Sequence, residues 1–143
     1  MTLVPDGRIM LPDMAATIRD LKVWQEAVAL AGEVVRSARQ GAKRETKVVS
    51  DQLMLTALSA AGTIADGYGR YTPAEQRQLY RSARRDLTRL ETLIAVACQA
   101  DLISSQTHTD LTNRIQSVMR LLGGYLVYLE RQLNSDAAGT ATR

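Results

Sequence analysis

Hydrophobic residues recur every three or four positions along four segments of the chain, which is the spacing of one face of an α-helix. In the first segment this stripe runs through Leu21, Val28 and Val35. Short polar turns separate the segments, so neighbouring helices should be antiparallel. The pattern therefore predicts an all-α protein, an antiparallel up-down-up-down four-helix bundle. The expected helices are, in chain order, residues 17–40, 47–66, 73–99 and a fourth that begins after Ser104 or Ser105 and ends near residue 133.

The two ends of the chain lack this period. Residues 1–16 show no clear periodicity and are expected to form a flexible leader. Residues 135–143 carry mostly small and polar side chains, and we expect a disordered tail there. The bundle itself is therefore assigned to residues 17–134.

The sequence IADGYGRYTPAEQ, between the second and third segments, contains a Gly-x-Gly pattern that also occurs in phosphate-binding loops. Such a loop would follow a strand and would carry a third glycine or a Gly-Lys-Ser/Thr sequence. Gly67 and Gly69 stand instead where a helix ends in a left-handed residue. Thr72, Pro73 and Glu75 have the order of an N-cap, a first helical residue and a capping-box partner. We interpret the segment as a hairpin between two helices.

Composition agrees with a helical bundle that has an aliphatic core. Apolar residues make up 45% of the 143 residues but aromatic residues only 4%, and Phe is absent. The chain has the length of a single domain that can bury a core without disulfides. Prolines occur only at Pro5, Pro12 and Pro73, which leaves two long stretches free of helix breakers.

The sequence also indicates where the protein is found. Its single cysteine, Cys98, cannot form an internal disulfide, and the N-terminal residues lack the basic start and the apolar run of a signal peptide. No apolar run approaches the roughly 20 residues that span a bilayer. We expect a soluble, cytoplasmic protein.

Few residues could support catalysis or bind a metal. The only histidine, His108, lies in a polar turn where we expect it to be exposed, and the Glu-x-x-His sequence of di-iron bundles is absent. Cys98 lies in an apolar run, so a buried structural thiol is the better interpretation. Because no convergent set of reactive groups is visible, we expect neither an enzyme nor a metal or cofactor.

The second and fourth helices carry more apolar surface than one core stripe uses, and such surface is usually covered by another subunit. We therefore predict a homo-oligomer. In the alternative interpretation, small residues let the helices approach closely, so that the bundle buries the surface itself. The apolar residues concerned are Met54, Leu55, Leu58, Met119, Leu121 and Val127, and the small ones are Ala60, Ala61, Gly62, Gly123 and Gly124.

Basic residues are concentrated in two regions, although the formal net charge is only +3. One region surrounds the turn between the first two helices, and the other forms a ridge of arginines spaced four residues apart on the third helix. In the bundle this ridge would run toward the first region, so the two could be continuous. Since only Tyr71 and Tyr80 interleave with arginines, we expect contact with nucleic-acid backbone, RNA or DNA, rather than with bases. The predicted binding residues are Arg70, Arg77, Arg81, Arg84, Arg85, Arg89, Lys43, Arg44 and Lys47.

Two alternatives to nucleic-acid binding remain open for these arginines. They could form a solvated helix face with local ion pairs, such as Arg85 or Arg89 with Asp86 or Glu91. They could also contact a protein partner, in which case the protein would be an interaction scaffold without a nucleic-acid role.

Three blocks of sequence resemble the 23S rRNA intervening-sequence proteins, a family of four-helix bundles. The blocks are DLKVWQEA (20–27), SAAGTIADGYGRYTPAEQ (59–76) and LTRLETLIAVACQADLI (87–103), and the resemblance covers about residues 18–133. In the middle block Ala61, Thr63 and Asp66 replace the family's Pro, Asn and Glu. The residues there that match the family pattern are Ser59, Ile64, Ala65, Gly67, Gly69 and Arg70.

The resemblance implies an up-and-down bundle that assembles into a ring-like homopentamer and has no established enzymatic activity. The same superfamily is similar to the accessory variability determinant of diversity-generating retroelements, a basic pentamer that binds a reverse transcriptase and nucleic acid. The resemblance therefore implies an accessory protein of a reverse transcriptase as one role, and a scaffold of the intervening-sequence branch as the other.

Overall fold

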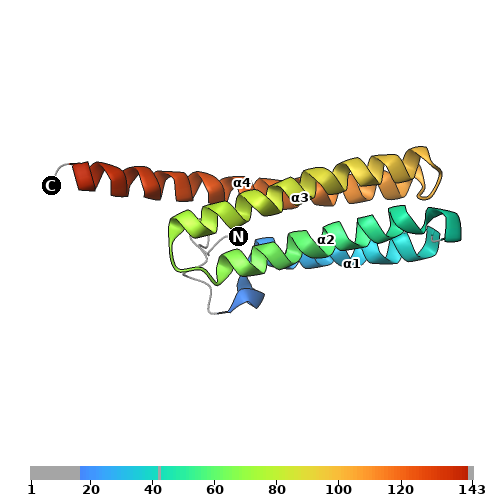
Figure 1. Cartoon of the computed structure of the whole chain (residues 1–143), viewed down its shortest axis with the longest axis horizontal. Helices are drawn as coiled ribbons and strands as arrows, with labels where there is room; N and C mark the ends of the chain where they lie inside the picture. Colours follow the sequence, from blue (N-terminus) through green and yellow to red (C-terminus); the bar gives the residue numbers. More distant parts are fainter. Residues whose placement is uncertain (1–16, 42, 142–143) are drawn as a thin grey trace.

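The computed structural model describes residues 17–41 and 43–141. These residues are mostly helical and contain no strand. Four long helices run alternately up and down along one axis (Figure 1). A single turn of 3₁₀ helix precedes each of the first two. The elements are η2 (Ile18–Asp20), α1 (Lys22–Gly41), η3 (Arg44–Thr46), α2 (Lys47–Tyr68), α3 (Pro73–Gln99) and α4 (Ser105–Ala141). The predicted all-α class and the four helices are confirmed for the described residues.

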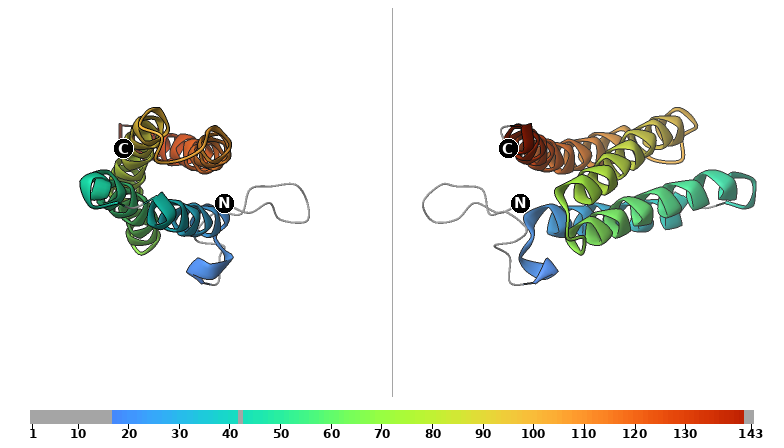
Figure 2. Two further views of the ribbon diagram at one scale, coloured as in Figure 1. Left: turned by 90° about the vertical axis from the view of Figure 1, so that its right-hand side faces the viewer. Right: turned by 60° about the vertical axis from the view of Figure 1, so that its left-hand side comes forward.

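The helices are arranged so that each packs against its two neighbours in the chain order, with α1 and α4 closing the bundle. Figure 2, viewed along the axis, shows α2 and α4 at diagonally opposite corners. The core between the helices is aliphatic, with Tyr80 and Tyr125 as its largest side chains. The stripes expected on the last three helices are largely buried, because their apolar residues follow the helical period.

The core-facing side of α1 differs from the expectation. Val28 is 42% exposed and Val35 is half-buried, whereas Val23 and Leu30 are buried. Because α1 carries apolar residues on more than one side, two overlapping stripes fit the helical period, and contact with α2 and α4 decides which one is buried.

The turn between α2 and α3 is a helical hairpin, as predicted. The Thr72 side-chain hydroxyl accepts a hydrogen bond from the Glu75 amide at 3.2 Å, and Pro73 is the first residue of α3. The glycines act differently from the prediction, since Gly69 has φ of −79° and is not left-handed. Gly67 is buried within α2, where an added Cβ would lie 2.9 Å from two ring carbons of Tyr80. Gly67 therefore allows α3 to approach closely.

The turn between α3 and α4 uses a non-glycine residue in the left-handed region, Asp101, with φ of 59°. Of the two candidate caps it is Ser104 that caps α4, since its Oγ accepts a hydrogen bond from the Thr107 amide at 3.1 Å.

The last helix is longer than the sequence predicts. It runs to Ala141 instead of ending near residue 133, so residues 135–141 of the predicted tail are helical. A helix that is already formed gains one hydrogen bond per added residue, and small polar residues without proline do not stop this propagation. Residues 142–143 and the predicted leader, residues 1–16, lie outside the described residues.

One stretch corrects the expectation that no segment could span a bilayer. Arg44–Tyr68, which includes α2, is long and apolar enough to do so by length and composition. Core helices of soluble proteins meet the same criterion, so the observation is weak evidence for a membrane.

Candidate nucleic-acid interface

The arginine ridge consists of Arg77, Arg81, Arg85 and Arg89, spaced four residues apart on α3. The opposite side of α3 is buried in the core through Ala83, Leu87 and Leu90, among others, and this fixes the direction in which the ridge points. Arg84, Arg81, Arg85 and Arg89 are exposed, whereas Arg77 is half-buried. The structure thus confirms that the ridge lies on the outer side of the helix.

A carboxylate from α4 binds the first half of the ridge. Nη1 of Arg77 lies 3.2 Å from Oε2 of Glu130, and Nη2 of Arg81 lies 2.7 Å from Oε1 of the same residue. One carboxylate therefore holds two guanidinium groups between α3 and α4. The sequence does not predict this contact, because Glu130 is far from both arginines along the chain.

The other arginines of α3 have no counter-ion among the described residues. Within residues 17–41 and 43–141, no ion pair involves Arg84, Arg85 or Arg89. They follow one another within two turns of α3, so three positive charges gather on a short stretch of surface.

The acids that were expected to pair locally with these arginines bind other groups. Asp86 accepts a hydrogen bond from the Ser59 hydroxyl of α2 at 2.8 Å, and Glu91 accepts one from the Gln116 amide of α4 at 3.4 Å. Both acids therefore link α3 to a neighbouring helix. In the part of the chain that the structure describes, the local ion pairs of the solvated-face interpretation are not formed.

Arg70 extends the basic surface toward the α2–α3 turn. It lies with Arg85 on the wall of a depression of about 310 Å³. Ser82 and Gln78 offer further hydrogen-bond donors there, whereas Glu75 adds one negative charge. The remaining wall residue is Leu79. Arg70 and Arg85, which are far apart in the hairpin sequence, thus share one surface.

The second basic region lies at the other turn of the bundle. Lys43 and Arg44 are exposed at η3, and Nζ of Lys47 pairs with Oδ2 of Asp51 at 2.7 Å. Among the described residues, no hydrogen bond or ion pair links Lys43, Arg44 or Lys47 to α3. The predicted continuity between the two basic regions has no contact to support it, and we treat this second region as separate.

Tyr80, one of the two tyrosines that interleave with arginines in the sequence, is buried. Its ring packs edge-on against Tyr125, with 4.8 Å between the ring centroids. Burial raises the pKa of the Tyr80 hydroxyl far above its ordinary value, and Tyr68 contributes to the same shift. Tyr80 therefore cannot stack on a base, whereas Tyr71 is fully exposed.

A second depression, of about 470 Å³, lies between α1 and α4. Nε of Arg114 lies 2.8 Å from Oε2 of Glu33, so an ion pair crosses it. The walls carry charges of both signs: Glu33, Arg36, Ser37, Gln40, Thr107, Asp110, Leu111 and Arg114. The balance of charge distinguishes this depression, which the sequence did not predict, from the basic surface of α3.

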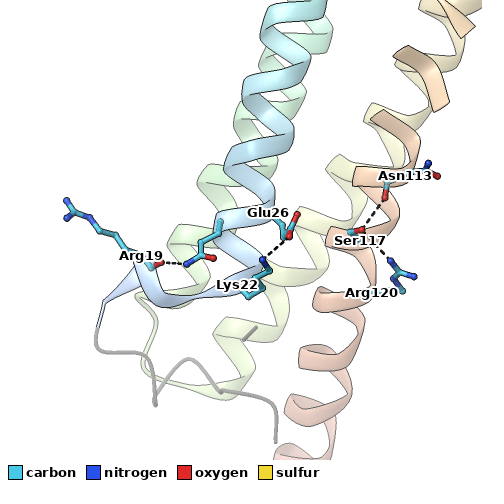
Figure 3. A network of polar contacts seen from close by, with 7 residues as sticks. Arg19, Lys22, Glu26, Asn113, Ser117 and Arg120 are labelled. Atoms are coloured by element: carbon cyan, nitrogen blue, oxygen red, sulfur yellow. Dashed lines mark hydrogen bonds and ion pairs between the residues drawn. The ribbon is translucent and has the colours of Figure 1, made fainter. Parts of the chain in front are cut away.

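Polar contacts continue along the same two helices (Figure 3). On α1, Lys22 pairs with Glu26 at 3.1 Å. On α4, the Ser117 hydroxyl donates to the Asn113 carbonyl at 3.3 Å and accepts from Arg120 at 3.3 Å. Each of these contacts stays within its own helix.

Possible metal ligands and nucleophiles are scattered over the described residues. Among residues 17–41 and 43–141, no group of three or more His, Cys, Asp or Glu side chains could hold a metal ion. His108 and Cys98 are both half-buried, so the histidine is less exposed and the cysteine less buried than expected.

Comparison with known proteins places the chain in a family. In fold it is similar to the crystal structure of a protein with unknown function from the S23 ribosomal protein family of Bacteroides thetaiotaomicron VPI-5482. The TM-score is 0.68 at 14% identity, and the match covers 73% of this chain and 97% of that one. A search of curated proteins finds no match. Residues 19–124 match the family model of the 23S rRNA-intervening sequence protein, and the chain therefore belongs to that family.

Proposed function

We propose that this protein is a non-enzymatic, homo-oligomeric adaptor that binds nucleic-acid backbone through Arg84, Arg85, Arg89 and Arg70. One observation carries the proposal: these arginines are exposed and, in the part of the chain that the structure describes, none has a carboxylate partner. A guanidinium group donates two parallel hydrogen bonds to a phosphate, which makes arginine well suited to this contact.

The arrangement favours backbone over base recognition. Because Tyr80 is buried, Tyr71 is the one exposed tyrosine that interleaves with these arginines, and a single ring does not form a platform for successive bases. Binding should therefore depend little on sequence and strongly on salt. Four phosphate contacts per subunit correspond to a slope of about −3.6 in log K against log salt on duplex DNA, or about a 100-fold loss of affinity between about 50 and 200 mM salt.

The homo-oligomeric part of the proposal rests on apolar side chains that the bundle leaves uncovered. Leu55 is 61% exposed, Leu58 55% and Val127 51%. Met54, Met119 and Leu121, which were expected on the same surface, pack against the core instead. A ring-like homopentamer is the assembly that the family resemblance implies, and we propose it on that ground.

The resemblance to the accessory variability determinant extends the proposal to a protein partner, a reverse transcriptase. The single cysteine supports a cytoplasmic location as part of the same proposal. A reverse-transcriptase gene with a template repeat beside the gene for this protein would support a role in a diversity-generating retroelement. Its absence would favour the intervening-sequence branch.

The test is a titration of fluorescently labelled RNA and DNA of mixed sequence, followed by anisotropy at low and raised salt. The triple variant Arg84→Gln, Arg85→Gln, Arg89→Gln should bind at least about 100-fold more weakly at low salt. The matched control, Arg19→Gln, Arg36→Gln, Arg39→Gln, removes the same charge from exposed residues of η2 and α1 and should bind almost normally. Equal affinity of the two variants would reject the site.

A scaffold without a nucleic-acid role is the second candidate. The observation that favours it is the depression between α1 and α4, whose balanced charges are typical of a protein contact. An oligomer that binds neither RNA nor DNA at low salt would make this the better interpretation.

A further inference from the structure

α2 is far more apolar than its position in the bundle requires. Its most apolar 18-residue stretch is only 33% buried. Val48, Leu55 and Leu58 are all more than half exposed. These side chains are separated by three and seven residues, so they lie on one side of the helix, away from the core. A soluble bundle with such a surface is usually completed by a partner.

The same side of α2 carries a gap and a charge. Gly62 lies four residues after Leu58, and an added Cβ there would meet nothing within 4 Å. Asp66 follows four residues later; it is exposed, and no ion pair among the described residues involves it. We call Val48, Leu55, Leu58, Gly62 and Asp66 the α2 face.

α4 presents a second outward surface of matching character. Val127 is exposed, and Gly123 beside it has open space on its Cβ side. Arg120 and Arg131 flank Val127 on the outer side; Arg120 donates only to the Ser117 hydroxyl, and no ion pair in the described part of the chain involves Arg131. We call Arg120, Gly123, Gly124, Val127 and Arg131 the α4 face.

The two faces cannot meet within one molecule. α2 and α4 occupy diagonally opposite corners of the bundle (Figure 2), and both faces point outward. The helices are parallel to each other, because the direction of the chain alternates from helix to helix (Figure 1).

The two faces overlap along the bundle but are offset from each other along its axis. The ring of Tyr80 touches Gly67 on one side and packs against Tyr125 on the other, so these three residues form one layer. Asp66 adjoins this layer on α2, as Val127 does on α4. At 1.5 Å per residue, Leu58, Gly62 and Asp66 lie about 13, 7 and 1 Å before this layer on α2. Gly123 lies about 3 Å before it on α4, and Val127 and Arg131 lie about 3 and 9 Å beyond it. A shift of about 10 Å along the helix axis between two copies therefore brings the two sets opposite each other.

We propose that the α2 face of one copy packs on the α4 face of the next, in a head-to-tail contact. With this shift, Leu58 and Gly62 of α2 lie opposite Gly123 and Val127 of α4. Asp66 then lies opposite Arg131, at the cationic end of the α4 face. Two different surfaces on opposite corners give a heterologous interface, which closes into a ring when the rotation between copies allows it. This inference rests on the homo-oligomer proposed above and adds which surfaces meet.

The proposal is tested by exchanging the charges on the two sides of the contact. Light scattering of the full chain at a series of concentrations then measures the mass of the assembly. Asp66→Arg and Arg131→Asp should each raise the concentration at which the assembly dissociates at least about tenfold, since like charges are then opposed. The double variant restores opposite charges and should recover the mass of the wild-type assembly. Leu58→Asp should dissociate it independently of Asp66.

A matched control is Val96→Asp on α3, which adds a carboxylate at a comparably exposed valine outside both faces and should leave the mass unchanged. A monomeric wild-type protein would overturn the proposal. Dissociation by Asp66→Arg without any effect of Arg131→Asp would overturn the head-to-tail arrangement, because α2 would then not meet α4. Anisotropy titrations then measure the RNA affinity of a dissociated variant. This measurement tests the nucleic-acid site separately from the interface between copies.

Discussion

Gly67 is the position where a single methyl group should reveal how closely α2 and α3 pack. In the middle of a helix, replacement of glycine by alanine normally stabilises by about 1 kcal/mol, because alanine loses less backbone freedom on folding. Gly67 is the penultimate residue of α2, so the gain there is at most of this size. At Gly67 the new Cβ would lie 2.9 Å from Cε1 and Cζ of Tyr80 and 3.3 Å from Cδ1. The ring has little room to retreat, since it is buried and packs against Tyr125.

Overpacking of a core costs about 1 to 3 kcal/mol. Since the gain in helix propensity offsets at most about 1 kcal/mol of this cost, Gly67→Ala should lower the free energy of unfolding by up to about 3 kcal/mol. Gly32, in α1, is the matched control, because its added Cβ would meet only the flexible end of Arg36 at 3.7 Å. Gly32→Ala should therefore stabilise by about 1 kcal/mol.

The assay is urea unfolding followed by circular dichroism at one protein concentration, with the m-value compared between variants. Tyr80→Leu serves as a second background, in which the ring is absent. There Gly67→Ala should regain the ordinary stabilisation, which gives a coupling energy of about 1 to 3 kcal/mol between the two positions.

Two results would refute this reasoning. Equal stabilisation by Gly67→Ala and Gly32→Ala would show that the ring of Tyr80 does not require a glycine at position 67. Destabilisation by Gly67→Ala that persists in the Tyr80→Leu background would assign the cost to another cause.

Three further predictions concern single side chains. Thr72→Ala should lower the free energy of unfolding by about 1 kcal/mol in urea, because the hydroxyl that caps α3 is lost. Tyr80→Phe should raise it by about 1 kcal/mol, since the buried hydroxyl has no hydrogen-bond partner among the described residues. Burial raises the folded-state pKa of the Tyr80 hydroxyl above its ordinary value of 10.0, so the unfolded chain releases this proton first as the pH rises. Above about pH 10, the free energy of unfolding of the wild-type protein should therefore fall more steeply with pH than that of Tyr80→Phe. Glu130→Gln should free Arg77 and Arg81, so that duplex DNA binds more tightly and the salt slope steepens by up to about 1.8 in anisotropy titrations; an unchanged slope would place both arginines outside the interface.

The sequence by itself determined the features that depend on local spacing. The number of helices, the bounds of α3 and the cap at Thr72 were predicted correctly, because backbone hydrogen bonds and caps join residues only three or four positions apart. The outward direction of the arginine ridge also followed from the helical period.

Only the tertiary structure decided which of these features face one another. Contacts between helices decide that Leu30 is buried instead of Val28. Contacts between helices also place the ring of Tyr80 against Gly67 and pair Arg77 with Glu130. The periodicity of one helix leaves its rotation against the others open when two apolar stripes overlap. The partners of a charge or a ring are set by packing between helices, since they lie tens of residues away along the chain.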